Sequence, residues 1–191
     1  MRIRILIILI LFTYISVQSQ EKPISKNSIS GGIGLGSSDG IKEVGFGAVF
    51  SLGYHRSFGT KNRFRLNPNF VYGGFSTTLI EDAGEHEFKI KSLELNAHYD
   101  VIKYKAFSFF LTLGGFISDS KGTSTSGGEL SNPADYPKDF NHTYSGFTTG
   151  FGIGIKQPDF PITLEIKILN IQFGKNDYDL GYFMIGANVK I

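Results

Sequence analysis

The chain has 191 residues, a formal net charge of +2, 19% charged and 14% aromatic residues. This balance lacks the basic excess of a nucleic-acid-binding domain and the high charge of a disordered chain. The absence of cysteine excludes disulfide bridges, zinc–thiolate sites and cysteine nucleophiles. We therefore expect one folded domain of ordinary size.

The N-terminal segment has the composition of a secretory signal peptide. Two arginines in "MRIR" precede the apolar run "ILIILILFTYISV", which is too short for a comfortable membrane span. Val17 and Ser19 stand at the positions where a cleavage site requires small or modest residues. We expect Met1–Ser19 to be removed before Gln20, so that residues 20–191 form the mature domain. An uncleaved anchor helix is the alternative.

The rest of the chain shows apolar residues alternating with small or polar ones. In "VGFGAVFSLGYHR" (residues 44–56) one face is apolar and the other is rich in glycine, and this period of two is typical of a strand with unlike faces. The same pattern predicts eight strands: Ser28–Gly36, Val44–Arg56, Arg63–Thr78, Phe88–Tyr99, Ala106–Ile117, Ser145–Lys156, Pro161–Phe173 and Leu180–Ile191.

The end of the first predicted strand and the start of the loop after it form "GGIGLGSSDG" (residues 31–40), which resembles a nucleotide-binding loop at first sight. The spacing Gly-x-Gly-x-x-Gly fails, because counting from Gly34 puts Asp39 at the last position, and a second strand rather than a helix follows. We therefore expect these glycines to line the inside of a barrel wall. Pro68 interrupts the third predicted strand, where a bulge or a later strand start is expected.

The predicted connections alternate in length. The connections after strands one, three, five and seven are Ser37–Glu43, Leu79–Glu87, Ser118–Tyr144 and Gly174–Asp179, and they include the longest loops, whereas the shortest turns lie at the other end of the sheet. An up-and-down barrel of the outer membrane has this arrangement, with long loops outside the cell and both termini on the periplasmic side. Most predicted strands are also close to the roughly 9–11 residues that a tilted strand needs to cross a bilayer.

The two faces of each strand point to a membrane rather than a soluble barrel. The apolar faces carry almost no charge at their centres, while the opposite faces are rich in glycine and polar residues, which suits a narrow lumen. The predicted fold class is all-β, an eight-stranded antiparallel up-and-down transmembrane β-barrel. A soluble, periplasmic, lipocalin-like barrel binding an apolar ligand is the alternative.

Several segments resemble the family of small outer-membrane β-barrel proteins, also called porin-like. "RLNPNFVYGGFS" (residues 65–76) is similar to the third strand of that family, and residues 91–118 resemble its central hairpin. "GFTTGFGIGIK" and "YFMIGANVKI" are similar to its sixth and eighth strands. The resemblance implies an OmpA- and OmpX-like eight-stranded barrel without catalytic residues. The usual C-terminal aromatic residue is absent, since the last residue is Ile191.

Ionisable residues occur on the predicted lumen faces. They are Arg65, Glu94, Glu165, Lys167 and Lys190, with His55 and His98. We interpret them as a structural network of ion pairs and hydrogen bonds that fills a narrow lumen, with Glu165 near Lys190 across a hairpin. A polar passage or gate is the alternative.

The predicted loops offer candidates for contacts at the cell surface. These are Glu81, Asp82, Glu85, His86 and Glu87 in one loop, and Tyr136, Phe140 and Tyr144 in the longest loop. Binding of divalent cations is the alternative for the acidic loop, but its spacing matches no calcium-binding loop, and we favour a solvated rim that keeps the exposed loops soluble. We expect no cofactor and no metal site.

The expected function is that of a non-enzymatic integral outer-membrane barrel with a structural or surface-interaction role. Its expected partners are outer-membrane lipid, lipopolysaccharide and the barrel-assembly machinery, with no nucleic acid and a monomeric state. A lipid-modifying barrel enzyme is the third hypothesis, with candidates on the loops or rim: His86, His142, Ser145, Asp135 and Asp139. No nucleophile elbow or paired-carboxylate arrangement marks them.

Overall fold

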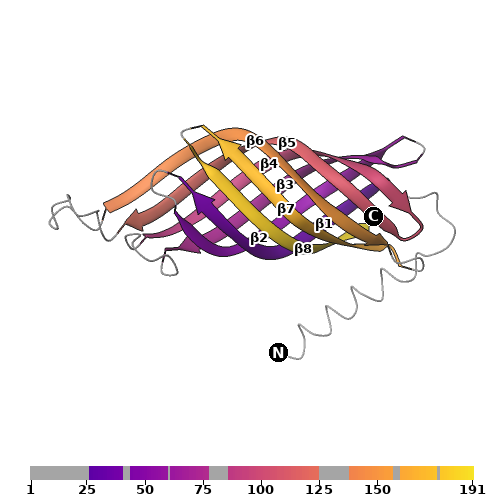
Figure 1. The fold of residues 1–191 in the computed structure, drawn as a ribbon, viewed down its shortest axis with the longest axis horizontal. Helices are drawn as coiled ribbons and strands as arrows, with labels where there is room; N and C mark the ends of the chain where they lie inside the picture. The colour runs from indigo at the N-terminus through magenta and orange to yellow at the C-terminus, as the bar shows by residue number, and fades with distance from the viewer. Residues whose placement is uncertain are drawn as a thin grey trace, which may run out of the picture.

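The computed structural model describes residues 26–40, 44–59, 61–77, 86–124, 138–156, 160–175 and 177–191. The strands within these ranges are β1 (Asn27–Asp39), β2 (Gly45–Phe58), β3 (Phe64–Ser76), β4 (His86–Tyr104), β5 (Phe107–Ser124), β6 (Lys138–Lys156), β7 (Ile162–Gly174) and β8 (Asp179–Lys190). Each strand pairs antiparallel with the next, and β1 also pairs with β8. Figure 1 shows the strands wrapping obliquely around one barrel. The predicted fold is confirmed.

Along the strands, successive side chains point alternately to the outside of the barrel and into its lumen. On β5, Leu111 and Leu113 are 47% and 66% exposed, whereas Thr112 between them is 3% exposed. This alternation follows from the pleat of a strand, in which successive side chains point to opposite faces. Along the middle of the strands the outer surface is consequently apolar, whereas polar side chains such as Thr112, Glu94 and Asn96 face the lumen. No helix in the described ranges is both long and apolar enough to cross a membrane.

Strands β4, β5 and β6 are longer than predicted, with 19, 18 and 19 residues. The predicted loop Ser118–Tyr144 is wrong at both ends, because Ser118 pairs with Tyr144 and Ser124 pairs with Lys138 in the β5–β6 ladder. The outer face of this extension carries polar side chains such as Asp119 and Lys121, so the apolar alternation that predicted the other strands is absent. In Figure 1 the long strands project beyond their neighbours.

Pro68 lies within β3 and causes neither a bulge in β3 nor a later strand start. It faces outward and pairs with Leu95 of β4, while the β2–β3 ladder omits the pairs between Gly53–Asn69 and Arg56–Leu66. The carbonyl of Tyr54 instead accepts a hydrogen bond from the Asn67 side-chain Nδ2 at 3.1 Å. A neighbouring side chain thus supplies the donor that proline lacks.

The period-two glycines of β1 lie on the lumen face, as predicted. A Cβ on Gly32 would lie 2.7 Å from Met184 Sδ, and one on Gly34 would overlap the carbonyl oxygen of Phe183 in β8. Glycine at these positions therefore lets neighbouring backbones approach and the sheet curve tightly. The segment is barrel wall, not a phosphate-binding loop.

Two β-bulges change which residues face the lumen. The registers of both β6–β7 and β7–β8 skip Ile168, so that Ile168 and Leu169 are both exposed outside. A second irregularity lies at Val101, between Asp100 and Ile102 of β4. Since a bulge adds one residue to one strand, the alternation shifts, and Asn170 and Gln172 point inward.

Candidate functional site

The lumen of the barrel is the candidate functional site, and its two ends differ in chemistry. The half near the long loops is apolar, and the half near the short turns contains the ionisable groups. A hydrogen-bonded layer centred on Glu94 lies between them.

The loop-end half is filled by a cluster of buried apolar side chains from β2, β3, β4, β5, β6, β8 and the residue before β8. The rings of Phe75 and Phe88 stack with centroids 5.3 Å apart, and those of Tyr144 and Tyr178 stack at 4.2 Å. Phe140 adds a tilted contact to Phe88 at 6.3 Å. Such aromatic packing fills this half of the lumen with apolar side chains.

The middle layer surrounds the carboxylate of Glu94, which is buried. Its Oε2 accepts hydrogen bonds from Nδ2 of Asn69 at 2.9 Å and of Asn96 at 2.8 Å. Its Oε1 accepts from Nε2 of Gln172 at 2.7 Å and from the hydroxyl of Tyr182 at 3.0 Å. The donors come from β3 and β4 on one side and from β7 and β8 on the other, so this network spans the lumen.

The short-turn half is organised around Arg65 of β3. One guanidinium nitrogen pairs with Asp100 Oδ1 at 3.0 Å, and the other pairs with Glu165 of β7. The guanidinium also lies 5.3 Å from the centre of the Phe110 ring. Arg65 therefore pairs with two buried carboxylates at once. One of them, Glu165, lies on the opposite wall of the barrel.

The two predicted lumen histidines are buried beside this ion-pair cluster. The rings of His55 and His98 meet edge to face with centroids 5.1 Å apart. Nδ1 of His98 lies 3.4 Å from the hydroxyl oxygen of Thr112. Both histidine rings are therefore packed against neighbouring side chains inside the lumen.

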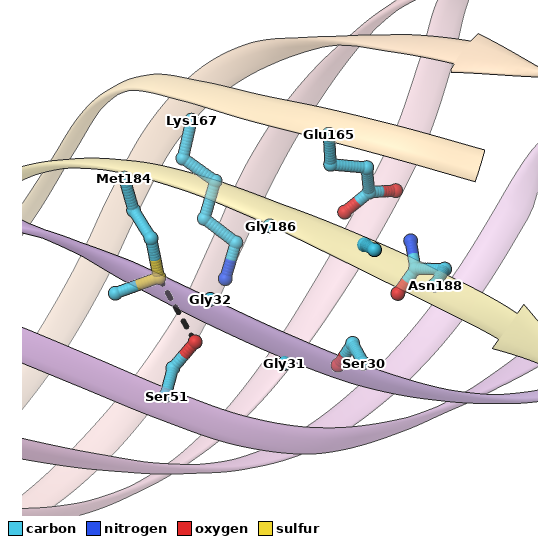
Figure 2. A pocket seen from close by; sticks show the side chains of 10 residues that line it. Ser30, Gly31, Gly32, Ser51, Glu165, Lys167, Met184, Gly186 and Asn188 are labelled. Carbon is cyan, nitrogen blue, oxygen red and sulfur yellow. Dashed lines mark hydrogen bonds between the residues drawn. The ribbon is translucent and has the colours of Figure 1, made fainter. Parts of the chain in front are cut away.

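Lys167 occupies the region between β7, β8 and β1. Figure 2 shows its ammonium directed toward β1, while the Glu165 carboxylate on the same strand is directed toward Asn188. Ser51 donates a hydrogen bond to the Met184 sulfur at 2.9 Å nearby. The residual cavity among these side chains is about 10 Å³, which is about the space of one water molecule.

The predicted proximity of Glu165 and Lys190 is wrong. Glu165 pairs across the hairpin with Gly186, whereas the Lys190 amide donates to the carbonyl of Pro161 at the short-turn end. The hairpin register explains the error, because the partner of Glu165 is Gly186, four residues before Lys190 along β8. Arg65 takes the place of Lys190 as the partner of Glu165.

The predicted surface residues are placed as follows. Glu81, Asp82, Glu85 and Tyr136 lie outside the described residues, and His86 begins β4. Glu87 is exposed on the outer face of β4. The loop placement of Phe140 and Tyr144 is wrong, because both lie in β6 with side chains 7% and 4% exposed. Neither belongs to an exposed loop tip.

The candidate residues for catalysis do not form a recognisable catalytic arrangement within the described ranges. Asp139 accepts a hydrogen bond from Thr123 at 3.0 Å, and the His142 ring packs between Phe140 and Tyr144. Asp135 lies outside the described residues. Among the residues that the structure describes, no group of three or more His, Asp or Glu side chains is arranged to hold a metal ion.

Sequence reasoning identified Arg65, Glu94, Glu165 and Lys167 as lumen residues but missed several of their partners. Asp100 falls just after the predicted end of its strand at Tyr99, although continuing the alternation by one residue would have included it. Gln172 was hidden by the bulge at Ile168, which reverses the alternation. The inward orientation of Tyr182 follows from the alternation, because its neighbour Phe183 belongs to the predicted apolar outer face.

The comparisons with known proteins identify similar structures only. No family model and no curated protein matches the sequence. Neisserial surface protein A (NspA) is 15% identical, with 87% of this chain and 98% of that chain covered and a TM-score of 0.61. Ail, the attachment invasion locus protein of Yersinia pestis, is 15% identical over 87% of this chain and 99% of that chain, with a TM-score of 0.55.

A second structure of Ail, in complex with the heparin analogue sucrose octasulfate, is 16% identical and covers 86% of this chain and 97% of that chain, with a TM-score of 0.57. These proteins are eight-stranded outer-membrane β-barrels. At such low identity the likeness concerns the fold. The fold of this chain is therefore that of the small outer-membrane β-barrels, as its sequence resemblance implied.

Proposed function

We propose that the protein is a non-enzymatic integral protein of the outer membrane, with a structural or cell-surface interaction role. The observation that carries this proposal is the apolar outer surface of a closed barrel whose polar groups are inside. Burying such a surface in lipid removes it from water, whereas a water-soluble barrel requires a polar exterior.

Aromatic side chains near the strand ends support a position across the bilayer. Near the short turns, Phe58, Phe64, Tyr104 and Phe107 are exposed outside, and near the long loops Phe46 and Phe173 are exposed. Outer-membrane barrels carry aromatic girdles at both lipid–water interfaces. We infer that the lipid-facing band lies between these two sets.

The soluble lipocalin-like alternative has less support. Its ligand site would need an open apolar interior, whereas here the apolar half of the lumen is filled by stacked rings. The lumen centre is occupied by the Glu94 network. A ligand would have to displace side chains that are already packed against one another or hydrogen-bonded to one another.

The lumen contacts also favour a barrel without a wide channel. Arg65 of β3 reaches Glu165 of β7, and the donors to Glu94 come from opposite walls. An eight-stranded barrel has an interior just wide enough for side chains. We expect no large, steady conductance when the protein is reconstituted into a planar bilayer.

The extension of β4, β5 and β6 supports a role at the surface. Its outer face carries charged side chains, among them Lys89, Lys91, Asp119 and Lys121, which lipid tails would not accommodate. With the termini on the periplasmic side, this part would stand at the level of the lipopolysaccharide headgroups. We propose lipopolysaccharide and outer-membrane lipid as its immediate partners, a monomeric state and insertion by the barrel-assembly machinery.

Membrane fractionation combined with heat-modifiable gel migration tests the proposal. We expect the protein in the outer-membrane fraction, soluble only with detergent, and migrating faster in the unheated than in the heated sample. Release into the periplasmic fraction without detergent would contradict it. Activity in lipase, palmitoyl-transferase or protease assays, lost on His142→Ala, would support the enzyme hypothesis instead.

A further inference from the structure

A second cavity lies at the short-turn mouth of the barrel, away from the loops and below the ion-pair cluster. Its volume is about 260 Å³, far above the roughly 15 Å³ needed for one water molecule. It approaches the roughly 300 Å³ at which pockets for small molecules begin. The cavity is lined by strand ends and by residues of the two turns β2–β3 and β4–β5.

The lining of this cavity is strongly basic. We call its six basic side chains the basic mouth: Lys61, Arg65, Lys103, Lys105, Lys156 and Lys190. The single carboxylate in the lining is Asp100, and it is shared by Arg65 at 3.0 Å and Lys103 at 3.3 Å. The second carboxylate partner of Arg65 is Glu165.

The remaining lysines of the basic mouth lack such partners. Within the described residues, Lys61, Lys105, Lys156 and Lys190 form no ion pair with a carboxylate side chain. Lys156 and Lys103 repel the partly buried Lys190 electrostatically. Like charges gathered in a concave mouth focus a positive field and raise the local concentration of anions. An anion bound among them would relieve the repulsion.

The neutral groups of the cavity favour the same kind of ligand. Ser28 is the ladder partner of Lys190 and Thr163 that of Lys156, and both hydroxyl-bearing residues line the same cavity as these lysines. The side chain of Lys103 is held in place by donating to the carbonyl of Asn62 at 3.0 Å. Ammonium and hydroxyl donors around one space suit an anion with several charged oxygens.

We propose that the basic mouth binds a phosphate-bearing anion. A monocarboxylate would neutralise only one of the lysines, whereas a phosphate group, and more so a chain of phosphates, presents several acceptor oxygens to several ammonium donors. The ligand is a free oligophosphate or the phosphate headgroup of an anionic lipid. The inference concerns the opposite end of the barrel from the surface role and does not depend on that role.

Titration calorimetry with inorganic tripolyphosphate, on the full chain in zwitterionic detergent, tests this site. We expect saturable binding that weakens as salt is added. The double variant Lys156→Gln/Lys190→Gln should bind at least about tenfold more weakly, because it removes two of the six cationic side chains of the site. The matched control Lys89→Gln/Lys121→Gln removes the same charge from the opposite end and should bind as the unaltered protein does.

Two further arms complete the experiment. Heat-modifiable migration of each variant shows that the barrel remains folded. Mass spectrometry of phosphatidylglycerol retained after purification identifies the source: retention lost in the Lys156/Lys190 variant indicates a lipid headgroup, and tripolyphosphate binding without retention indicates a soluble phosphate. Equal loss of binding in the control variant, equal binding of citrate, or no saturable binding would overturn the proposal.

Discussion

The two halves of the lumen are packed by different means. Near the loops, stacked rings such as Phe75 on Phe88 fill the space, and near the short turns Arg65 joins Asp100 and Glu165. Ring packing is non-directional and tolerates small changes of shape. A buried ion pair instead depends on both partners, since the removal of one leaves a charge stranded.

From this difference we expect the polar half to depend more strongly on single residues than the apolar half does. The apolar half adjoins the extended strands β4–β6, whereas the polar half adjoins the short turns and the basic mouth. The following predictions test the contrast, with unfolding in urea followed by circular dichroism because the chain contains no tryptophan.

The largest effect is expected for Arg65→Met. It strands the buried carboxylate of Glu165 and weakens the pairing of Asp100, so the free energy of unfolding should fall by about 3–5 kcal/mol. Adding Glu165→Leu to the same chain should recover part of the loss, because the stranded charge is then removed. A loss below about 1 kcal/mol for the single variant would show that the ion-pair cluster does not hold this half.

A somewhat smaller effect is expected for Phe88→Ala in the loop-end half. Loss of a ring that contacts both Phe75 and Phe140 should cost about 3 kcal/mol. Phe88→Leu, which keeps most of the apolar volume, should lose much less. Raising the salt concentration should leave the Phe88→Ala loss unchanged; a strong salt dependence would contradict apolar closure of this half.

Tyr182→Phe tests the layer between the halves. The change removes a hydroxyl that donates to Glu94 at 3.0 Å and accepts from Asn170, so we expect a loss of about 1–2 kcal/mol. Tyr104→Phe, at an exposed position on β4, is the matched control and should be neutral. Equal stability of both variants would mean that Glu94 does not need its fourth donor.

The smallest effect is expected at the rim. Lys103 pairs with Asp100 at 3.3 Å with its side chain 38% exposed, so Lys103→Gln should cost less than about 1 kcal/mol. Lys121→Gln, which breaks a pair of the same length with Asp119, is the control at the other end. If Lys103→Gln lowered the free energy of unfolding as much as Arg65→Met, Lys103 would belong with Arg65, Asp100 and Glu165 among the ion pairs that stabilise this half.

The sequence predicted the barrel well because its apolar outer face repeats with a period of two on each strand. The same period placed Arg65, Glu94, Glu165 and Lys167 in the lumen, where the structure has them. It failed beyond the lipid-facing band, where residues 118–124 and 138–144 form strands whose outer face is polar. Because their outer face is polar, these segments lack the apolar outward residues from which the other strands were predicted.

The pairings inside the lumen were beyond prediction for a different reason. Arg65 and Glu165 lie on β3 and β7, on opposite walls, so their contact depends on the closure and stagger of the whole barrel. The bulge at Ile168 changes the facing of all later residues of β7. Neither feature leaves a local signal, so Gln172 and Glu94 could not have been paired from the sequence.

The central claim is that the apolar outer face contacts lipid while the polar groups close the lumen. Since the chain lacks cysteine, single cysteines at Leu111, Thr112 and Leu113 can each carry a spin label in lipid vesicles. Labels at Leu111 and Leu113 should be relaxed by oxygen, which concentrates in lipid, and not by a water-soluble nickel complex. A label at Thr112 should be relaxed by neither reagent. Relaxation of the Leu111 and Leu113 labels by the nickel complex would show that this face meets water and would contradict the account.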